Sequence, residues 1–423
     1  MKRTVDYSER QNLQTGTETE NNSVLFRTHP TSRFDRKPPV FRKPNEIGNY
    51  SVDKNRLFTQ NRSNMKYFIP PRNPNTVNFD LTIGYKEMIR KDESKKEYLD
   101  YILRWILCNK SKFQLQTKDG TKQNNRDLHT DFICWRGLLT KLLCTPYENR
   151  DDWLIAITKC NNTIYMCEFE TEHRKKNKAE MTERQDEMSC WGWKFEQYVT
   201  ADKPDGTPVT TEPVNNNEEY STVVRSRLES HSLVFSGEVD AMDTTSGCEG
   251  CKYVEFKTNR EIEYNRQRQN FQRFKLIKWW AQSYLVGIPK IVCGYRDDDG
   301  IVHRLETINT LDIPNQLQEM RDPWKPNVSL NFLDQLLTFI KANVTEDNPR
   351  SVYLMSWQPG RDIQLCKQPS LSEKYQFLPE WYTTNFQEEE PDKKKTKLEE
   401  SSSDKSNSTK YLNSVDKIMT PGK

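Results

Sequence analysis

One stretch of the chain, residues 231–296, constrains the fold more than any other part, because strand and helix patterns follow one another in it without interruption. Two short segments alternate apolar and polar residues, and a longer amphipathic segment predicts a helix that Gly287-Ile288-Pro289 ends. The predicted elements, in order, are a strand at Ser232–Asp240, a turn at 244–250, a strand at Lys252–Thr258, a helix at 263–286 and a strand at Ile291–Tyr295. The pattern predicts a core that mixes strands and helices.

Four charged residues of this stretch have the spacing of a catalytic centre. Glu238 and Asp240 lie two apart and share one face of the first strand, and Glu255 and Lys257 share one face of the second. If the two strands pair, three carboxylates converge, and their repulsion requires protons or cations. Mg²⁺ or Mn²⁺ suits such oxygen ligands, and two ions can clamp both oxygens of a phosphoryl displacement. The pattern is typical of metal-dependent nucleases; the alternative is a pair of solvent-facing strands with cross-strand salt bridges.

The predicted helix adds a basic surface beside these acids. Residues 266–278 are rich in Lys and Arg, which neutralise the phosphates of nucleic acids, so we assign this surface to substrate. The side chains that fall close to one stripe of the helix are Phe271, Lys275, Lys278 and Gln282. The aromatic residues that we assign to the core are Phe274, Trp279 and Trp280. An ordinary amphipathic surface helix is the alternative.

Polar segments flank a central part that is large enough for one core. We predict disordered tails at 1–33 and 386–423 and a single domain at 34–385. The lysines at 393–397 form either a nuclear import signal or part of a solvated tail. The net charge of +3 indicates neither a histone-like nor an acidic protein, so any nucleic-acid surface is local.

Other local patterns predict individual elements of the central part. Periodicity predicts a helix at 92–108 and polar composition a loop at 109–131, and two strands flank Asn161-Asn162 as a hairpin. No apolar run approaches the ~18 residues of a membrane span, so we expect no membrane association. Cys248 and Cys251 form either half of a zinc site or, as we favour without a second pair, a glycine-containing turn.

The sequence resembles the decapping exoribonuclease family (DXO) over most of its length, from about residue 34 to about 382. The segments that carry the resemblance are EIGNYSVDKNR, VNFDLTIGY, WRGLLTKLLCTPYE, GWKFEQY, RSRL, FSGEVD, YVEFKT, KWWAQSYLVGIP and GYR. The resemblance implies an α+β fold in which two mixed β-sheets pack together with surrounding helices. It also implies a deep active-site cleft and a restriction-nuclease-like catalytic core.

The resemblance also implies roles for particular residues. Glu196 joins the three acids as a metal ligand, together with the main-chain carbonyl of Phe256. Lys257 and Gln282 are implied to contact the scissile phosphate. The residues implied to contact the RNA 5′ end are Arg56, Glu97, Trp135, Arg136, Gly137, Ser221, Glu238, Lys257 and Gln282. Ser221 replaces a cysteine of the family, and its hydroxyl is the stronger hydrogen-bond donor.

The function implied is that of an active hydrolase in mRNA 5′-end quality control, because the acid set, the lysine and the glutamine are all present. It removes unmethylated caps and NAD caps, releases pyrophosphate from 5′-triphosphate RNA and degrades RNA from 5′ to 3′. We expect a monomer, located in the nucleus and also in the cytoplasm. The alternatives are an endonuclease of the restriction-enzyme type and a non-catalytic partner of a nuclear 5′–3′ exoribonuclease that binds RNA ends.

Overall fold

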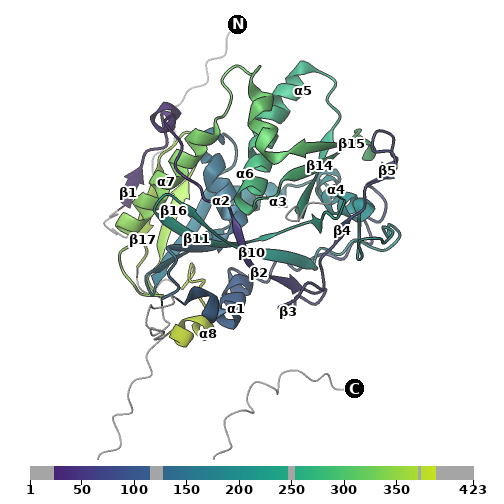
Figure 1. Cartoon of the computed structure of the whole chain (residues 1–423). Helices are drawn as coiled ribbons and strands as arrows, with labels where there is room; N and C mark the ends of the chain where they lie inside the picture. Colours follow the sequence, from purple (N-terminus) through teal and green to yellow (C-terminus); the bar gives the residue numbers. More distant parts are fainter. Residues whose placement is uncertain (1–22, 115–126, 246–252, 370–372, 387–423) are drawn as a thin grey trace, which may run out of the picture. The chain divides into compact units, whose positions relative to one another are not determined.

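A computed structural model describes residues 23–114, 127–245, 253–369 and 373–386 (Figure 1). Its larger sheet has ten strands, and parallel pairing of β6 with β8 and β11 makes it mixed. In spatial order these strands are β1 (Ser23–Phe26), β17 (Ile363–Lys367), β16 (Tyr353–Trp357), β7 (Trp153–Cys160), β8 (Thr163–Phe169), β6 (Phe132–Trp135), β11 (His231–Glu238), β10 (Glu219–Leu228), β2 (Asn45–Val52) and β3 (Phe58–Thr59).

The smaller sheet has seven strands and is also mixed, because β13 pairs with β14 and β12 with β4 in parallel. Its order is β5 (Phe79–Asp80), β15 (Ile301–Asn309), β14 (Lys290–Arg296), β13 (Tyr253–Arg260), β12 (Ala241–Met242), β4 (Tyr67–Phe68) and β9 (Thr200–Ala201). The fold expected from the sequence, two mixed sheets with surrounding helices, is confirmed.

Helices cover the sheets and join them through shared hydrophobic clusters. The α-helices are α1 (Asp100–Cys108), α2 (Arg136–Cys144), α3 (Glu172–Ala179), α4 (Glu183–Val199), α5 (Asn265–Asn270), α6 (Leu276–Val286), α7 (Pro326–Asn343) and α8 (Glu380–Thr383). Residues of α2, α6 and α7 share the largest cluster with both sheets, α1 and α8 pack on the larger sheet, and α4 packs on the smaller one. No helix of the described ranges is both long and apolar enough to cross a membrane.

Several local predictions are confirmed. The hairpin exists as β7 and β8 around Asn161-Asn162, where both residues have positive φ. Gly287 ends α6 in the left-handed conformation that suits glycine at this position. The helix predicted at 263–286 is present as α5 and α6, but a π-helical turn over Phe271–Lys275 joins them. The predicted turn at 244–250, with Cys248 and Cys251, lies mostly outside the described residues.

Two local predictions are wrong in part. The helix predicted from residue 92 begins only at Asp100, because the Asp92 side chain accepts hydrogen bonds from Ser94 in a local turn and Tyr98 has a φ of 39°. The predicted N-terminal tail is ordered from residue 23. There β1 pairs with β17, and Phe26 is buried in the main cluster.

The two strands that carry the catalytic pattern are also arranged differently from the prediction. They do not pair, because β11 lies in the larger sheet between β6 and β10, and β13 lies in the smaller sheet between β12 and β14. The chain leaves β11 at Glu238, crosses to the other sheet and pairs with β13 only over the two residues of β12. Glu238 and Asp240 therefore lie at the crossing between the sheets rather than along one strand.

Candidate active site

Glu255 is the centre of the site, because the side chains of Lys257, Gln282 and Arg136 all approach its carboxylate. It lies on β13, is 1% exposed, and its Oε1 accepts hydrogen bonds from Lys257 Nζ at 2.5 Å and from Gln282 Nε2. Its Oε2 lies 3.6 Å from Arg136 Nη1 and has no hydrogen-bond partner among the described atoms. A buried carboxylate oxygen without a hydrogen-bond partner is costly, so this atom is available to a further ligand.

Asp240 reaches the same place from the crossing segment. Its Oδ2 accepts a hydrogen bond from the main-chain N–H of Phe256 at 2.6 Å. The N–H and carbonyl groups of one strand residue point to the same edge of the strand, so the carbonyl of Phe256 also faces the Asp240 side. Only the family resemblance implies a ligand role for Phe256, and the backbone geometry is compatible with that role.

Arg136 and Gly237 fix the position of Glu238. Arg136 begins α2 and is 8% exposed, and its Nη2 donates to the carbonyl oxygen of Glu238 at 3.2 Å. A Cβ atom on Gly237 would lie 2.9 Å from the Cβ of Arg136, so only glycine allows this approach. Sequence reasoning did not single out Gly237, although it stands inside the FSGEVD segment.

The acids shift one another's pKa upwards. The Glu238 side chain is exposed to the cavity, yet desolvation by the surrounding protein, followed by repulsion from Glu219 and Asp240, raises its pKa to about 8. Burial and then Glu255 raise the pKa of Asp240 to about 7. Glu196, on α4, has its pKa raised well above the usual value by burial and then by repulsion from Asp240 and Glu238. The predicted acids thus affect one another's ionisation.

The donor set fits a hard divalent cation, because its four carboxylates, one of which is that of Glu255 with its Oε2 lacking a hydrogen-bond partner, and a main-chain carbonyl are all oxygen ligands. In the described part of the chain, no three acidic, His or Cys side chains are gathered at metal-ligand spacing. Lys257 and Gln282 occupy one oxygen of Glu255 instead. Burial alone lowers the pKa of Lys257, but Glu255 and Asp240 outweigh it and raise the pKa, so this ammonium remains charged.

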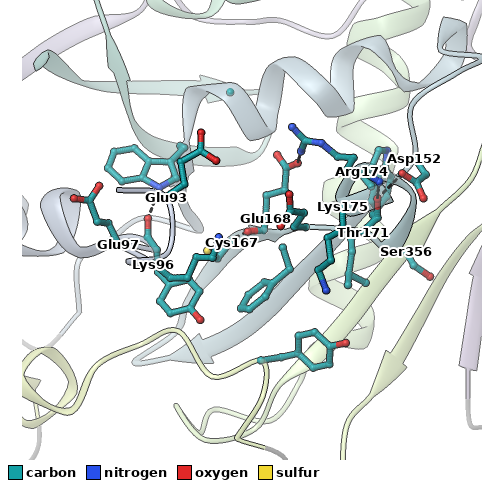
Figure 2. Close-up of a pocket in the computed structure, with 18 of the residues that line it drawn as sticks. Glu93, Lys96, Glu97, Asp152, Cys167, Glu168, Thr171, Arg174, Lys175 and Ser356 are labelled. Atoms are coloured by element: carbon teal, nitrogen blue, oxygen red, sulfur yellow. Dashed lines mark hydrogen bonds and ion pairs between the residues drawn. The ribbon is translucent and has the colours of Figure 1, made fainter. Parts of the chain in front are cut away.

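Glu238, Arg136 and Ser221 also line a cavity of about 1530 Å³, whereas Glu255, Lys257 and Gln282 are not among its lining residues. Ser221 is 2% exposed and stands opposite Glu238 in the pairing of β10 with β11. Figure 2 shows part of the cavity, with Glu97 and Lys96 at one end of the drawn residues and Asp152 at the other.

Arg56 and Glu97 line the cavity as predicted, but as members of an ion-pair network. Arg56 donates through Nε and Nη2 to Glu97 at 2.9 and 2.7 Å, and its Nη1 lies 2.6 Å from Glu219. Lys91 also pairs with Glu97, at 2.5 Å. Burial favours the protonated acid, yet hydrogen bonds from Arg56, Lys91 and Tyr101 lower the pKa of Glu97 to about 2. No pattern in the sequence indicated Glu219 or Lys91.

Trp135 and Gly137 flank Arg136 on the cavity wall, and Trp135 Nε1 donates to the carbonyl oxygen of Tyr98 at 2.6 Å. The structure does not place the whole predicted stripe of the helix at 263–286 beside the acids. Only Gln282 reaches the acids, whereas Lys278 pairs with Glu148 at 2.9 Å and is not among the lining residues of the cavity. Trp279 and Trp280 are buried as predicted, and Phe274 is half-buried beneath Arg150.

The two-sheet fold, with an aspartate beside a Glu-x-Lys strand, defines a nuclease of the restriction-enzyme class, a hydrolase. The particular family follows from comparison: the RAI1-like PD-(D/E)XK nuclease family matches residues 42–383, and the chain belongs to it. The Decapping and exoribonuclease protein of Xenopus laevis is 39% identical over 353 residues, which cover 82% of this chain and 87% of the relative. The nuclease class expected from the sequence is confirmed.

Solved structures agree with this assignment. S. pombe Rai1 in complex with 3′-FADP is 25% identical and has a TM-score of 0.64, covering 82% of this chain and 100% of that chain. Candida albicans Rai1 in complex with pU5-Mn²⁺ shares the fold at 22% identity and a TM-score of 0.70, covering 83% of this chain and 97% of that chain.

Proposed function

We propose that the protein is a divalent-metal-dependent hydrolase that removes defective or non-canonical 5′ ends from RNA. One observation carries the proposal: Glu255 accepts hydrogen bonds from Lys257 and Gln282, and its Oε2 lies 3.6 Å from Nη1 of Arg136, which lines the cavity together with Glu238. The name of the Xenopus laevis relative and the 3′-FADP ligand of S. pombe Rai1 support decapping and dinucleotide-type caps as substrates.

Each side chain has a role that its position allows. Glu196, Glu238, Asp240 and Glu255, with the carbonyl of Phe256, would hold two Mg²⁺ or Mn²⁺ ions. Bound divalent cations would supply a nucleophilic water and neutralise the charge of a phosphoryl displacement. Lys257 keeps its charge and would hold the scissile phosphate, and the Gln282 amide would donate a hydrogen bond to it.

The product would depend on which phosphate lies beside Lys257. Release of pyrophosphate, an unmethylated cap dinucleotide, an NAD-type cap or a 5′ mononucleotide would all follow from the same displacement. Ser221, Arg56, Glu97 and the segment Trp135-Arg136-Gly137 would position the RNA 5′ end. We further propose that the protein is a monomer in the nucleus and cytoplasm and has a nuclear exoribonuclease as a partner. Size-exclusion chromatography tests the monomer, imaging the location and co-purification the partner.

The direct test uses purified protein with Mg²⁺ or Mn²⁺ and three labelled RNAs that carry a triphosphate, an unmethylated cap or an NAD end. The Glu238→Ala/Asp240→Ala variant is the matched control. We expect wild type alone to release pyrophosphate, cap dinucleotide or NAD, and to leave a circular RNA intact. RNA binding without turnover on any end would refute the enzyme and favour a binding protein, and cleavage of the circle would favour an endonuclease.

A further inference from the structure

Helix α3 runs beside the cavity without packing into the core. Every residue from 172 to 185 is exposed, and α3 has no buried side chain. An isolated helix of eight residues is marginal in water, so polar contacts with the rest of the fold determine where α3 lies. Its first turn nevertheless lines the cavity, because the lining includes Glu172, His173, Arg174 and Lys175.

The two ends of α3 contact different sides of the cavity. At its start, the Thr171 hydroxyl donates to Asp152 at 2.7 Å and Arg174 pairs with Glu168 at 2.5 Å. At its end, Lys178 pairs with Glu93. Figure 2 shows Asp152 and Glu93 at opposite ends of the drawn group, with Glu168 between them. An eight-residue helix is about 12 Å long, so α3 bridges two sides of the cavity.

The contacts at the start of α3 are the stronger ones. Thr171 is 9% exposed, and Glu168 is held by Lys141 as well as by Arg174. The Lys178 and Glu93 side chains are instead 54% and 64% exposed, and such an ion pair shifts an equilibrium only a few-fold. The end of α3 next to Glu93 therefore detaches more readily than its start.

The opposite side is more firmly fixed than α3. Ile89 exchanges main-chain hydrogen bonds with Val214 and Asn216 at 2.9 and 3.2 Å, and Lys91 joins the Glu97 network at 2.5 Å. Glu93 lies two residues after Lys91 in the same segment. On the other side of Lys178, the exposed residues 180 and 181 link α3 to the capping box that starts α4 at Thr182. Any relative movement of the two sides of the cavity therefore changes the position of α3 and of this short link.

We propose that α3 is a gate of the substrate cavity, pivoting near Thr171 and latched by the Lys178–Glu93 pair. A polynucleotide chain must extend through the opening while its 5′ end is bound, whereas a dinucleotide-sized substrate enters whole. The latch therefore limits the entry of the polynucleotide more than the entry of the dinucleotide. Lys178 and Glu93 are thus specificity-determining residues that act through the position of α3. The inference rests on the proposed function and adds how the same site selects among its substrates.

The kinetic test compares a 5′-triphosphate single-stranded RNA with a 5′-triphosphate dinucleotide. Lys178→Ala and Glu93→Ala should each raise kcat/KM for the RNA roughly two- to fivefold and leave the dinucleotide unchanged. The charge-swapped Glu93→Lys/Lys178→Glu variant should restore the wild-type ratio. Lys176→Ala is the matched control, since Lys176 pairs with Glu180 next to α3 rather than across the cavity. Equal changes for both substrates, or none, would overturn the gate.

A second measurement does not depend on activity. Amide hydrogen exchange of residues 172–180 should be roughly two- to fivefold faster in Lys178→Ala than in Lys176→Ala. A Glu93→Cys/Lys178→Cys pair joined by a bis-methanethiosulfonate crosslinker, which spans the length of the two original side chains, should slow this exchange and block the RNA but not the dinucleotide, and reduction should reverse both effects. A wild type that is inactive on every RNA refutes the proposed function, whereas identical exchange in the two lysine variants refutes the gate.

Discussion

Metal binding should release protons from the acid cluster, because its carboxyls have pKa values raised to near neutral pH or above. At pH 7 a carboxyl with a pKa of about 8, as at Glu238, holds its proton in roughly nine molecules of ten. One with a pKa of about 7, as at Asp240, holds it in roughly half. A cation requires the ionised forms, so these two groups release about one and a half protons per protein, and Glu196 adds to this number.

The assay is titration calorimetry of the metal-free protein with Mg²⁺ or Mn²⁺ in buffers of different ionisation enthalpy. The heat difference between buffers counts the protons. Raising the pH from 7 to 9 should lower the count by more than one proton, because Glu238 and Asp240 are then ionised before the metal binds. Apparent metal affinity should rise steeply over the same range.

The direction in which the stability of the metal-free protein changes with pH also follows from these pKa shifts. Both acids have folded-state pKa values above their unfolded values, so the metal-free protein loses stability as pH rises from about 4 to about 8. Added cation should therefore raise the melting temperature more at pH 8 than at pH 6. Glu180→Gln, an exposed acid outside the cluster, is the control and should change neither result. Release of less than about half a proton at pH 7 would refute the reasoning.

Three further predictions concern single side chains. Lys257→Met and Gln282→Ala should each lower turnover of capped RNA about 10²-fold with little loss of RNA binding in a filter assay, because both groups lie at the Glu255 carboxylate and would donate to the scissile phosphate. Gly237→Ala should cost about 1–3 kcal/mol in urea unfolding by forcing Arg136 aside, whereas Gly192→Ala, whose new Cβ meets nothing within 4 Å, should not destabilise. Arg56→Ala should cost about 1–3 kcal/mol by leaving Glu97 and Glu219 with Lys91 alone, and Arg62→Ala, at an exposed pair, less than about 0.5 kcal/mol.

Local sequence pattern was sufficient for the chemistry of the site. The two-residue spacing of Glu255 and Lys257 places both side chains on one face of β13, and the structure joins them directly. The helix that follows carries Gln282 to the same carboxylate even though a π-turn interrupts it. These relations span fewer than 30 residues, so periodicity alone determines most of their geometry.

Pairing between distant segments could not be predicted in this way. Alternation assigns Ser232–Asp240 to a strand but does not choose its neighbours, and β11 pairs with β6, about 100 residues earlier. Strand β1 pairs with β17 across some 340 residues, so Ser23–Phe26 looks like part of a polar tail in the sequence. Glu196 comes from a helix with no spacing relation to β13, and only the family resemblance indicated it.

The crossing between the sheets explains why the cluster needs a counter-charge. Glu238 ends a strand of the larger sheet, Glu255 lies on the smaller sheet, and Glu196 comes from the helix packed on that smaller sheet. Each backbone position is fixed by its own hydrophobic cluster, so the acids cannot separate to relieve their repulsion. Protons and Lys257 offset that repulsion in the absence of metal, and a bound cation would replace the protons. The same acids would then tie the two sheets together, so metal binding and sheet packing should be thermodynamically linked.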